Sequence, residues 1–185
     1  MVAGSILPIS FNEKNELCFL FGKENPMEDS AKGFSDFGGR LENKEKPFEG
    51  ALREGSEELT GFLGNSKQLR TLIKKNGGYY KIKVNTYHIH IFYMPYDSDL
   101  PIYYNNNHAF LWDKMDKEIL NETRLFEKIE INWFTEKQMQ SRKGEFRNFY
   151  QEMVDVMLND EKIKNFAQKC KTKHGKNKTL RKIKN

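Results

Sequence analysis

Short stretches in which hydrophobic and polar residues alternate predict a β-sheet. Residues 16–23 (ELCFLFGK) carry apolar side chains on both faces, which is typical of a central strand that is covered on both sides. Residues 2–9 form a short apolar run, and Pro8 within it favours an edge or strand-end position. Residues 79–84 and 87–94 are expected to pair across a tight turn. Shorter strands are expected at 34–37 and 129–134.

Two longer stretches follow the period of an amphipathic helix. The first is predicted over residues 47–59, because Pro47 fits a first helical turn and Gly61 fits a left-handed stop after the last turn. Gly55 weakens this helix, and its presence indicates close packing against the sheet. The second helix is predicted over residues 145–160, where aromatic and aliphatic residues recur at helical spacing.

The segment that follows the predicted hairpin has no clear period. Residues 95–124 contain two prolines and three consecutive asparagines, so an exposed, irregular loop is expected there. A short helix is expected within it at 113–121. Loops near a catalytic helix often determine which substrate is accepted.

The composition is that of one globular domain. The chain has 185 residues, of which 37% are hydrophobic, and no apolar run approaches the roughly 20 residues of a membrane span. Its first residues lack the basic and apolar regions of a secretory signal. Cys18 and Cys170 lie far apart and form no metal-binding pattern, so we expect two reduced thiols and a cytoplasmic location.

The net charge of +5 is unevenly distributed along the chain. Residues 162–185 contain ten Lys or Arg residues and no Asp or Glu, whereas residues 1–161 carry a net charge of −5. We therefore expect a folded domain over 1–161 and a flexible basic tail over 162–185, whose apolar content is too low for folding alone. Such tails bind phosphate backbones in a salt-dependent manner, although a solubilising or localising role is equally consistent with the composition.

Residues 38–61 (GGRLENKEKPFEGALREGSEELTG) combine two glycines, a polar loop and a helix with an acidic side. Glu54, Glu57 and Glu58 fall together on this helix, whereas Leu52 falls on a different, apolar face. Carboxylates at this spacing repel one another unless a cation lies between them. Their hard oxygen atoms suit Mg²⁺ or Mn²⁺.

This stretch resembles the box of the Nudix hydrolases, which runs Gly, five residues, Glu, seven residues, Arg-Glu, two residues, Glu-Glu, one residue and Gly. The matching residues are Gly39, Glu45, Arg53, Glu54, Glu57 and Glu58. The chain departs from the box at its end, where Thr60 stands in place of the glycine and Gly61 follows one residue late. A solvated acidic helix face is the alternative, but it does not explain the spaced Gly39 and Glu45.

The resemblance implies an α/β (α+β) protein, namely a Nudix-type α/β/α sandwich with a mixed, curved sheet. It also implies hydrolysis of a phosphate anhydride with Mg²⁺ or Mn²⁺ as cofactor. The expected metal ligands are the backbone carbonyl of Gly38 and the side chains of Glu54, Glu57 and Glu58. Arg53 is expected to pair with Glu57 and fix its rotamer, and Glu45 is expected to hold the loop against the helix.

The general base is left open between two carboxylates. Glu57 belongs to the box, and Glu127 precedes a strand that looks similar to the one leading into the last helix of Nudix proteins. A solvated strand end is the alternative for Glu127. His88 and His90 share one strand face and could bind a metal, but we expect ordinary cross-strand polar residues.

The resemblance implies a type of reaction but leaves several substrates open. The basic tail and the lysines on strand 79–84 favour the 5′ cap of mRNA, so that RNA is the expected partner. The candidate RNA contacts are Lys81, Lys83, Lys171, Lys173, Arg181 and Lys182. The stretch EELTGFLG is similar to Nudix proteins of large DNA viruses, some of which remove caps, and such a protein would act in the host cytoplasm.

Two other functions remain open. The first is a housecleaning hydrolase of small nucleotides, dinucleoside polyphosphates or inositol pyrophosphates. The second is a non-catalytic RNA-binding module that kept the fold, which is less consistent with the four box glutamates.

Overall fold

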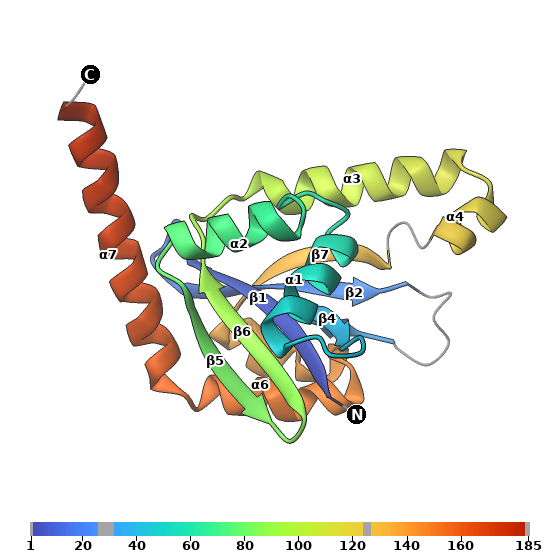
Figure 1. Ribbon diagram of the computed structural model, residues 1–185, viewed down its shortest axis with the longest axis horizontal. Coiled ribbons are helices and arrows are strands. Elements are labelled where there is room, and N and C mark those ends of the chain that lie inside the picture. The colour runs from blue at the N-terminus through green and yellow to red at the C-terminus, as the bar shows by residue number, and fades with distance from the viewer. Residues whose placement is uncertain (1, 26–31, 124–126, 184–185) are drawn as a thin grey trace.

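The computed structural model describes residues 2–25, 32–123 and 127–183, without the side chains of Asn121, Thr123 and residues 176–183. The described strands form one mixed sheet of seven strands (Figure 1). The strands are β1 (Ala3–Phe11), β2 (Leu17–Glu24), β3 (Phe34–Ser35), β4 (Phe37–Arg40), β5 (Tyr79–Val84), β6 (Tyr87–Tyr93) and β7 (Lys128–Thr135). The helices are α1 (Pro47–Glu58), α2 (Ser66–Lys75), α3 (Asp99–Lys114), α4 (Lys117–Thr123), α5 (Glu136–Ser141), η1 (Lys143–Glu145), η2 (Asn148–Tyr150), α6 (Gln151–Leu158) and α7 (Glu161–Ile183).

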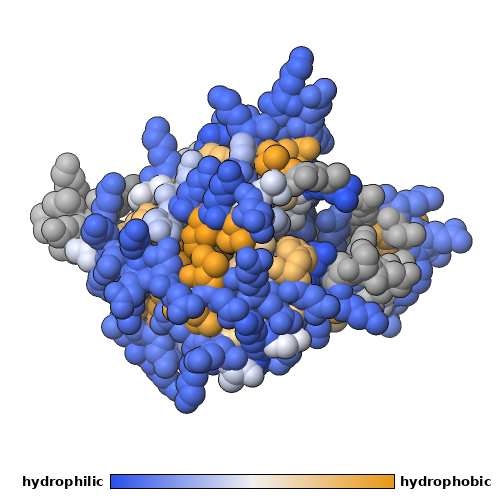
Figure 2. Space-filling view, turned by 90° about the horizontal axis from the view of Figure 1, so that it is seen from below, coloured by the Kyte–Doolittle hydropathy of each residue, from blue (hydrophilic) through white to orange (hydrophobic). Residues whose placement is uncertain are grey.

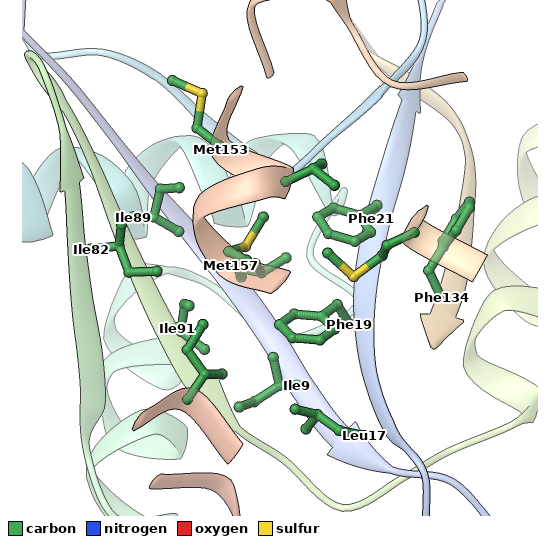
Figure 3. Close-up of a cluster of buried hydrophobic side chains, with 14 of the residues drawn as sticks. Ile9, Leu17, Phe19, Phe21, Ile82, Ile89, Ile91, Phe134, Met153 and Met157 are labelled. Atoms are coloured by element: carbon green, nitrogen blue, oxygen red, sulfur yellow. The ribbon is translucent and has the colours of Figure 1, made fainter. Parts of the chain in front are cut away.

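Helices cover both faces of this sheet. One hydrophobic cluster joins the sheet to α1, α2 and α3, and a second joins the opposite face to α5, α6 and α7. In the second cluster, Met153 and Met157 of α6 lie over side chains of β1, β2 and β6 (Figure 3). The α/β/α sandwich with a mixed sheet is therefore confirmed.

The first strand is central and does not lie at an edge as Pro8 had indicated. β1 pairs in parallel with β6 along one side and in antiparallel with β4 and β2 along the other. The register places β4 opposite residues 3–6 and β2 opposite residues 9–11. Pro8 lies between these two pairings, so its missing N–H group costs no hydrogen bond to β4 or β2.

The prediction of an irregular loop over residues 95–124 is wrong, because α3 and α4 occupy much of this segment. Pro101 is tolerated since it lies in the first turn of α3, where N–H groups have no partner within the helix. Leu100, Tyr104 and His108 recur every four residues and are buried. Asn105 donates to the carbonyl of Ile131 and accepts from its N–H group, so the helix is tied to β7.

The prediction of one long helix over residues 145–160 also gave the wrong boundaries. Its apolar residues do enter the core, but α6 begins only at Gln151. Phe146 has extended backbone angles and forms a bridge with Phe34, and the N–H group of Arg147 donates to the carbonyl of Phe34. This pairing holds residues 146–147 outside a helix.

The basic segment for which a flexible tail over 162–185 had been predicted forms most of a helix in the described part of the structure. α7 covers Glu161–Ile183, and Ile163, Ala167 and Cys170 are buried in the core. The low apolar content misled the prediction because three residues at helical spacing are enough to dock the first half of the helix. The far end of α7 projects beyond the body of the protein (Figure 1).

The box helix α1 begins at Pro47 as predicted and ends at Glu58. Its close packing on the sheet is confirmed, because a Cβ atom at Gly55 would lie 2.4 Å from Cδ1 of Ile6. The late glycine does not lengthen the helix, since Thr60 itself adopts a left-handed conformation with φ of 51° and Gly61 follows with φ of 75°.

No helix in the described part of the chain is long and apolar enough to cross a membrane. The face seen from below is mostly hydrophilic, with hydrophobic residues exposed in several places, most prominently near its centre (Figure 2). Cys18 and Cys170 are buried free thiols, and burial raises the pKa of Cys18 to about 12.

Replacing Thr60 by glycine is expected to stabilise the protein, because a β-branched residue at positive φ is strained. The expected gain is about 1 kcal/mol, or roughly 2–4 °C in Tm, measured by thermal unfolding. Gly61→Ala is the matched control. A Cβ atom there meets nothing within 4 Å, so its expected loss of about 1 kcal/mol reflects the backbone alone. A lower Tm for Thr60→Gly would contradict the assignment of strain.

Candidate active site

The box helix approaches the sheet through glycines, and this approach defines the site. A Cβ atom at Gly4 of β1 would lie 2.3 Å from the carbonyl oxygen of Pro47. At Gly39 of β4, a Cβ atom would lie 2.5 Å from Cδ of Glu54 and 2.6 Å from both of its carboxylate oxygens. The Glu54 carboxylate therefore lies directly against the backbone of Gly39, which is the close approach that only glycine permits.

Arg53 organises the acidic residues around it. Its Nε and Nη2 atoms donate to the two oxygens of Glu45 at 3.1 and 3.0 Å, and Nη2 also donates to the carbonyl of Arg40 at 3.1 Å. Its Nη1 atom donates to Glu54 at 2.9 Å and to Glu57 at 3.4 Å. The predicted pairing with Glu57 is present, but Glu45 and Glu54 are the closer partners.

These contacts shift the ionisation of the site. Hydrogen bonds from Arg53 hold the pKa of Glu45 below its usual value and, in return, raise the pKa of Arg53. Burial raises the pKa of Glu54, and the nearby carboxylates of Glu57 and Glu45 act in the same direction against Arg53. Glu45 also accepts from the N–H group of Glu42 at 2.9 Å, so it joins the loop to the helix as expected.

The three glutamates of the predicted ligand set differ in exposure and in partners, and their joint role as metal ligands stays a prediction. The side chain of Glu57 is 57% exposed and that of Glu54 is 18% exposed, whereas Glu58 turns inward and is buried. Glu58 accepts from the N–H group of Gly38 at 2.8 Å and pairs with the Lys128 ammonium at 3.2 Å. Glu57 and Glu58 are adjacent in sequence, so their side chains leave α1 about 100° apart.

Lys128 is a residue of the site that the sequence did not indicate. It lies on β7, is buried, and pairs with Glu24 as well as Glu58. Although burial disfavours the ammonium, the carboxylates of Glu58 and Glu24 outweigh it and raise the pKa of Lys128. Lys128 precedes the strand predicted over 129–134, and the register shifts between Lys23 and Glu24 on the paired strand, which interrupts the alternation of faces.

The fit of a divalent ion is therefore partial. Within the described residues, no three His, Cys, Asp or Glu side chains form a group that could hold a metal. Glu54 and Glu57 offer hard oxygen atoms of the kind that Mg²⁺ or Mn²⁺ accepts. A cation would relieve the repulsion between them, which adds to burial in raising the pKa of Glu54. Glu58 differs from them because one of its oxygens accepts from Gly38 and the other pairs with Lys128.

Glu127 lies close enough to Glu58 that its charge helps to raise the Glu58 pKa, after the larger effect of burial. Its carbonyl accepts from the N–H group of Asn25. The role of Glu127 as base or ligand stays a prediction.

Among the predicted RNA contacts, Lys83 lies apart from the acidic residues of the box. The pairing places Lys83, His88, Gly4 and Gly39 in one row across four strands, or about 14 Å from end to end. The start of α1 covers Gly4, so Lys83 lies on the other side of this helix from Glu54.

The lysines of α7 belong to the opposite face of the sheet. Lys171 donates to Asn15 at 2.6 Å and lies over the ring of Phe11, and Lys173 is exposed. The side chains of Arg181 and Lys182 lie outside the described part of the structure.

His88 and His90 do not form a metal site among the described residues. His90 is buried, lies with Nδ1 3.0 Å from the carbonyl of Ser5, and contacts the rings of Phe48 and Tyr79. These contacts make His90 a packing residue.

Comparison with known proteins finds similarity in shape. An Ap4A hydrolase from C. elegans in a binary complex matches with 11% identity over 90% of this chain and 96% of its own, with a TM-score of 0.48. A MutT/Nudix family protein from Listeria innocua matches with 15% identity over 83% and 88%, with a TM-score of 0.43. A NUDIX hydrolase from Listeria monocytogenes matches with 14% identity over 90% and 97%, with a TM-score of 0.43. The chain is similar to Nudix hydrolases.

No family model matches the chain, and no curated protein matches it. With identities of 11–15% and TM-scores below 0.5, the similarity alone assigns neither family nor substrate. The functional assignment therefore depends on the box residues and their geometry.

His90 predicts a defined pH dependence. Burial lowers its pKa from 6.5 to about 4, so as the pH falls below 6.5 the unfolded chain takes up a proton before the folded protein does. Relative to His90→Asn, the wild-type protein should lose stability between pH 6.5 and 4, by on the order of 3 kcal/mol. Urea unfolding of both proteins over this range measures the difference.

The control is His88→Asn, since the His88 ring is less buried and a smaller difference is expected. Stability curves for wild type and His90→Asn that stay parallel from pH 7 to pH 4 would show that His90 is not buried in its neutral form.

Proposed function

We propose that this protein is a Nudix-type hydrolase that cleaves a phosphate anhydride in a nucleoside diphosphate-linked substrate. The observation that carries the proposal is the placement of the Glu54 carboxylate against Gly39, beside the exposed Glu57, with both side chains held by Arg53. Arg53 is held in turn by Glu45. The spaced box residues thus form one connected structure.

Each residue of this structure has a chemical role in the proposal. Arg53 fixes the rotamers of Glu54 and Glu57 through charged hydrogen bonds. Glu57 is the more exposed carboxylate and can accept a proton from an attacking water. Glu54 and Glu57 are the side chains that would hold Mg²⁺ or Mn²⁺, which when bound neutralises phosphate charge and acidifies water.

The favoured substrate is the 5′ cap of mRNA. The support is the charge of α7, whose first half is anchored in the core while its far end projects from the body (Figure 1). Five Lys or Arg residues follow Gly175, and such a segment can bind an RNA backbone. The alternative is a small-nucleotide hydrolase, for which these charges are irrelevant.

Glu57→Gln is expected to reduce turnover by about 10²-fold or more, because it removes a proton acceptor and a hard ligand together. Products from a mixed pool of capped RNA, nucleotides and inositol pyrophosphates would be measured by mass spectrometry with Mg²⁺ or Mn²⁺ present. Glu49→Gln is the matched control, since Glu49 is an exposed glutamate in the first turn of the same helix. Unchanged turnover in Glu57→Gln would remove Glu57 from the chemistry, and absence of any product in wild type would overturn the proposal.

A chain that ends at Gly175 separates the two substrate classes. It keeps Ile163, Ala167 and Cys170, whereas truncation at residue 162 would remove part of the core. Cleavage of capped RNA is expected to fall about tenfold at low salt, with the difference shrinking as salt is added. Hydrolysis of small nucleotides should stay unchanged.

The matched control is the full-length chain with the five Lys or Arg residues after Gly175 replaced by glutamine. It should behave as the truncated chain does, because charge and not length is the proposed cause. Equal cleavage of capped RNA by all three proteins would favour the small-nucleotide alternative.

A further inference from the structure

The ammonium group of Lys128 has a complete set of acceptors. It donates to Ser35 at 3.0 Å, lies 3.2 Å from Glu58 and contacts Glu24. An ammonium has three N–H donors, so these three partners satisfy it fully. The side chains of Lys128, Glu24 and Glu58 are between 1% and 6% exposed, so water does not compete for these contacts.

Two cations serve the two carboxylates that contact Lys128. Glu24 also accepts from Arg147 at 2.7 Å, while the charges of Asp36 and Glu127 act on Lys128 and Glu58 from further away. Removing one partner of such a buried group is strongly destabilising, because it leaves an uncompensated buried charge. A divalent ion bound to Glu58 would lie beside the Lys128 ammonium, and the two cations would repel each other.

The surrounding fold makes room for this lysine. A Cβ atom at Gly22 would lie 2.8 Å from Cγ of Lys128, so the glycine admits the lysine stem. The hydroxyl of Tyr104 lies 2.9 Å from the carbonyl of Glu58 and 2.8 Å from the carbonyl of Lys128. This contact fixes the end of α1 against β7 and aligns the two charged side chains.

Glu58 has a structural task on its other oxygen. Its Oε2 atom accepts from the N–H group of Gly38 at 2.8 Å, next to Gly39, which lies under Glu54. The carboxylate therefore joins the glycine strand β4, the box helix and β7. Glu58 is a positioning residue in this arrangement, since it acts on the site through the glycine backbone.

We propose that Lys128 is the resident cation of Glu58, so that this box glutamate positions the glycine strand and does not ligate a divalent ion. The inference deepens the proposed function, on which it rests, by restricting the metal-binding side chains of the box to Glu54 and Glu57.

Binding of Mn²⁺ tests the division of roles without any measurement of activity. Electron paramagnetic resonance of free Mn²⁺ would give the affinities of wild type, Glu54→Gln and Glu58→Gln. We expect Glu54→Gln to weaken binding about tenfold or more, and Glu58→Gln to leave binding unchanged while lowering the Tm. Weakening by Glu58→Gln to the same extent as by Glu54→Gln would overturn the inference.

A double-mutant cycle tests the ion pair independently of any metal. Lys128→Met is expected to unfold at much lower urea than wild type, because it leaves the carboxylates of Glu58 and Glu24 without the ammonium. Adding Glu58→Gln to Lys128→Met should recover most of the loss, since residues in contact are not additive. If Lys128→Met alone does not fold, folding of the double variant is the expected recovery.

The cycle also separates the two proposals. Additive losses in the double variant would overturn the role of Lys128 and leave the proposed hydrolase untouched. Absence of Mn²⁺ binding in wild type together with recovery in the double variant would overturn metal-dependent hydrolysis while supporting the Lys128–Glu58 pair.

Discussion

The close contact between α1 and the central strand β1 is the constraint on which the rest of the structure depends. Glycines at Gly4 and Gly55 let the helix lie on the sheet without an intervening side chain at those points. At this short separation, the carboxylate of Glu54 reaches the backbone of Gly39 and that of Glu58 reaches Gly38. A larger residue at either contact would displace the acidic side chains from the glycine strand.

This contact divides the acidic residues into two electrostatic groups. Arg53 is shared by the outer group of carboxylates, which are Glu45, Glu54 and Glu57. Lys128 and Arg147 balance the inner group beneath it. The acidic residues of α1, which are close together in the sequence, therefore lie on one accessible side and one internal side of the helix. The accessible side is available for chemistry, and the internal side holds the helix in place.

Local patterns predicted much of the fold and part of the site. The box helix, the strand cores and the contacts of Arg53 and Glu45 all depend on residues close together in sequence. The central position of β1, the helix α3 and the anchoring of α7 depend on partners far along the chain, which periodicity does not record. Lys128 was missed for the same reason, because a bulge opposite Glu24 decides which way it faces.

The amide of Asn105 has a consequence for association between molecules. By exchanging two hydrogen bonds with the backbone of Ile131, it imitates a neighbouring strand along the outer side of β7. Exposed strand edges are templates for β-sheet growth from one chain to the next. A helix side chain thus occupies the backbone groups of Ile131 that a strand of another chain would need, and it comes from the three asparagines that had resembled a loop signal.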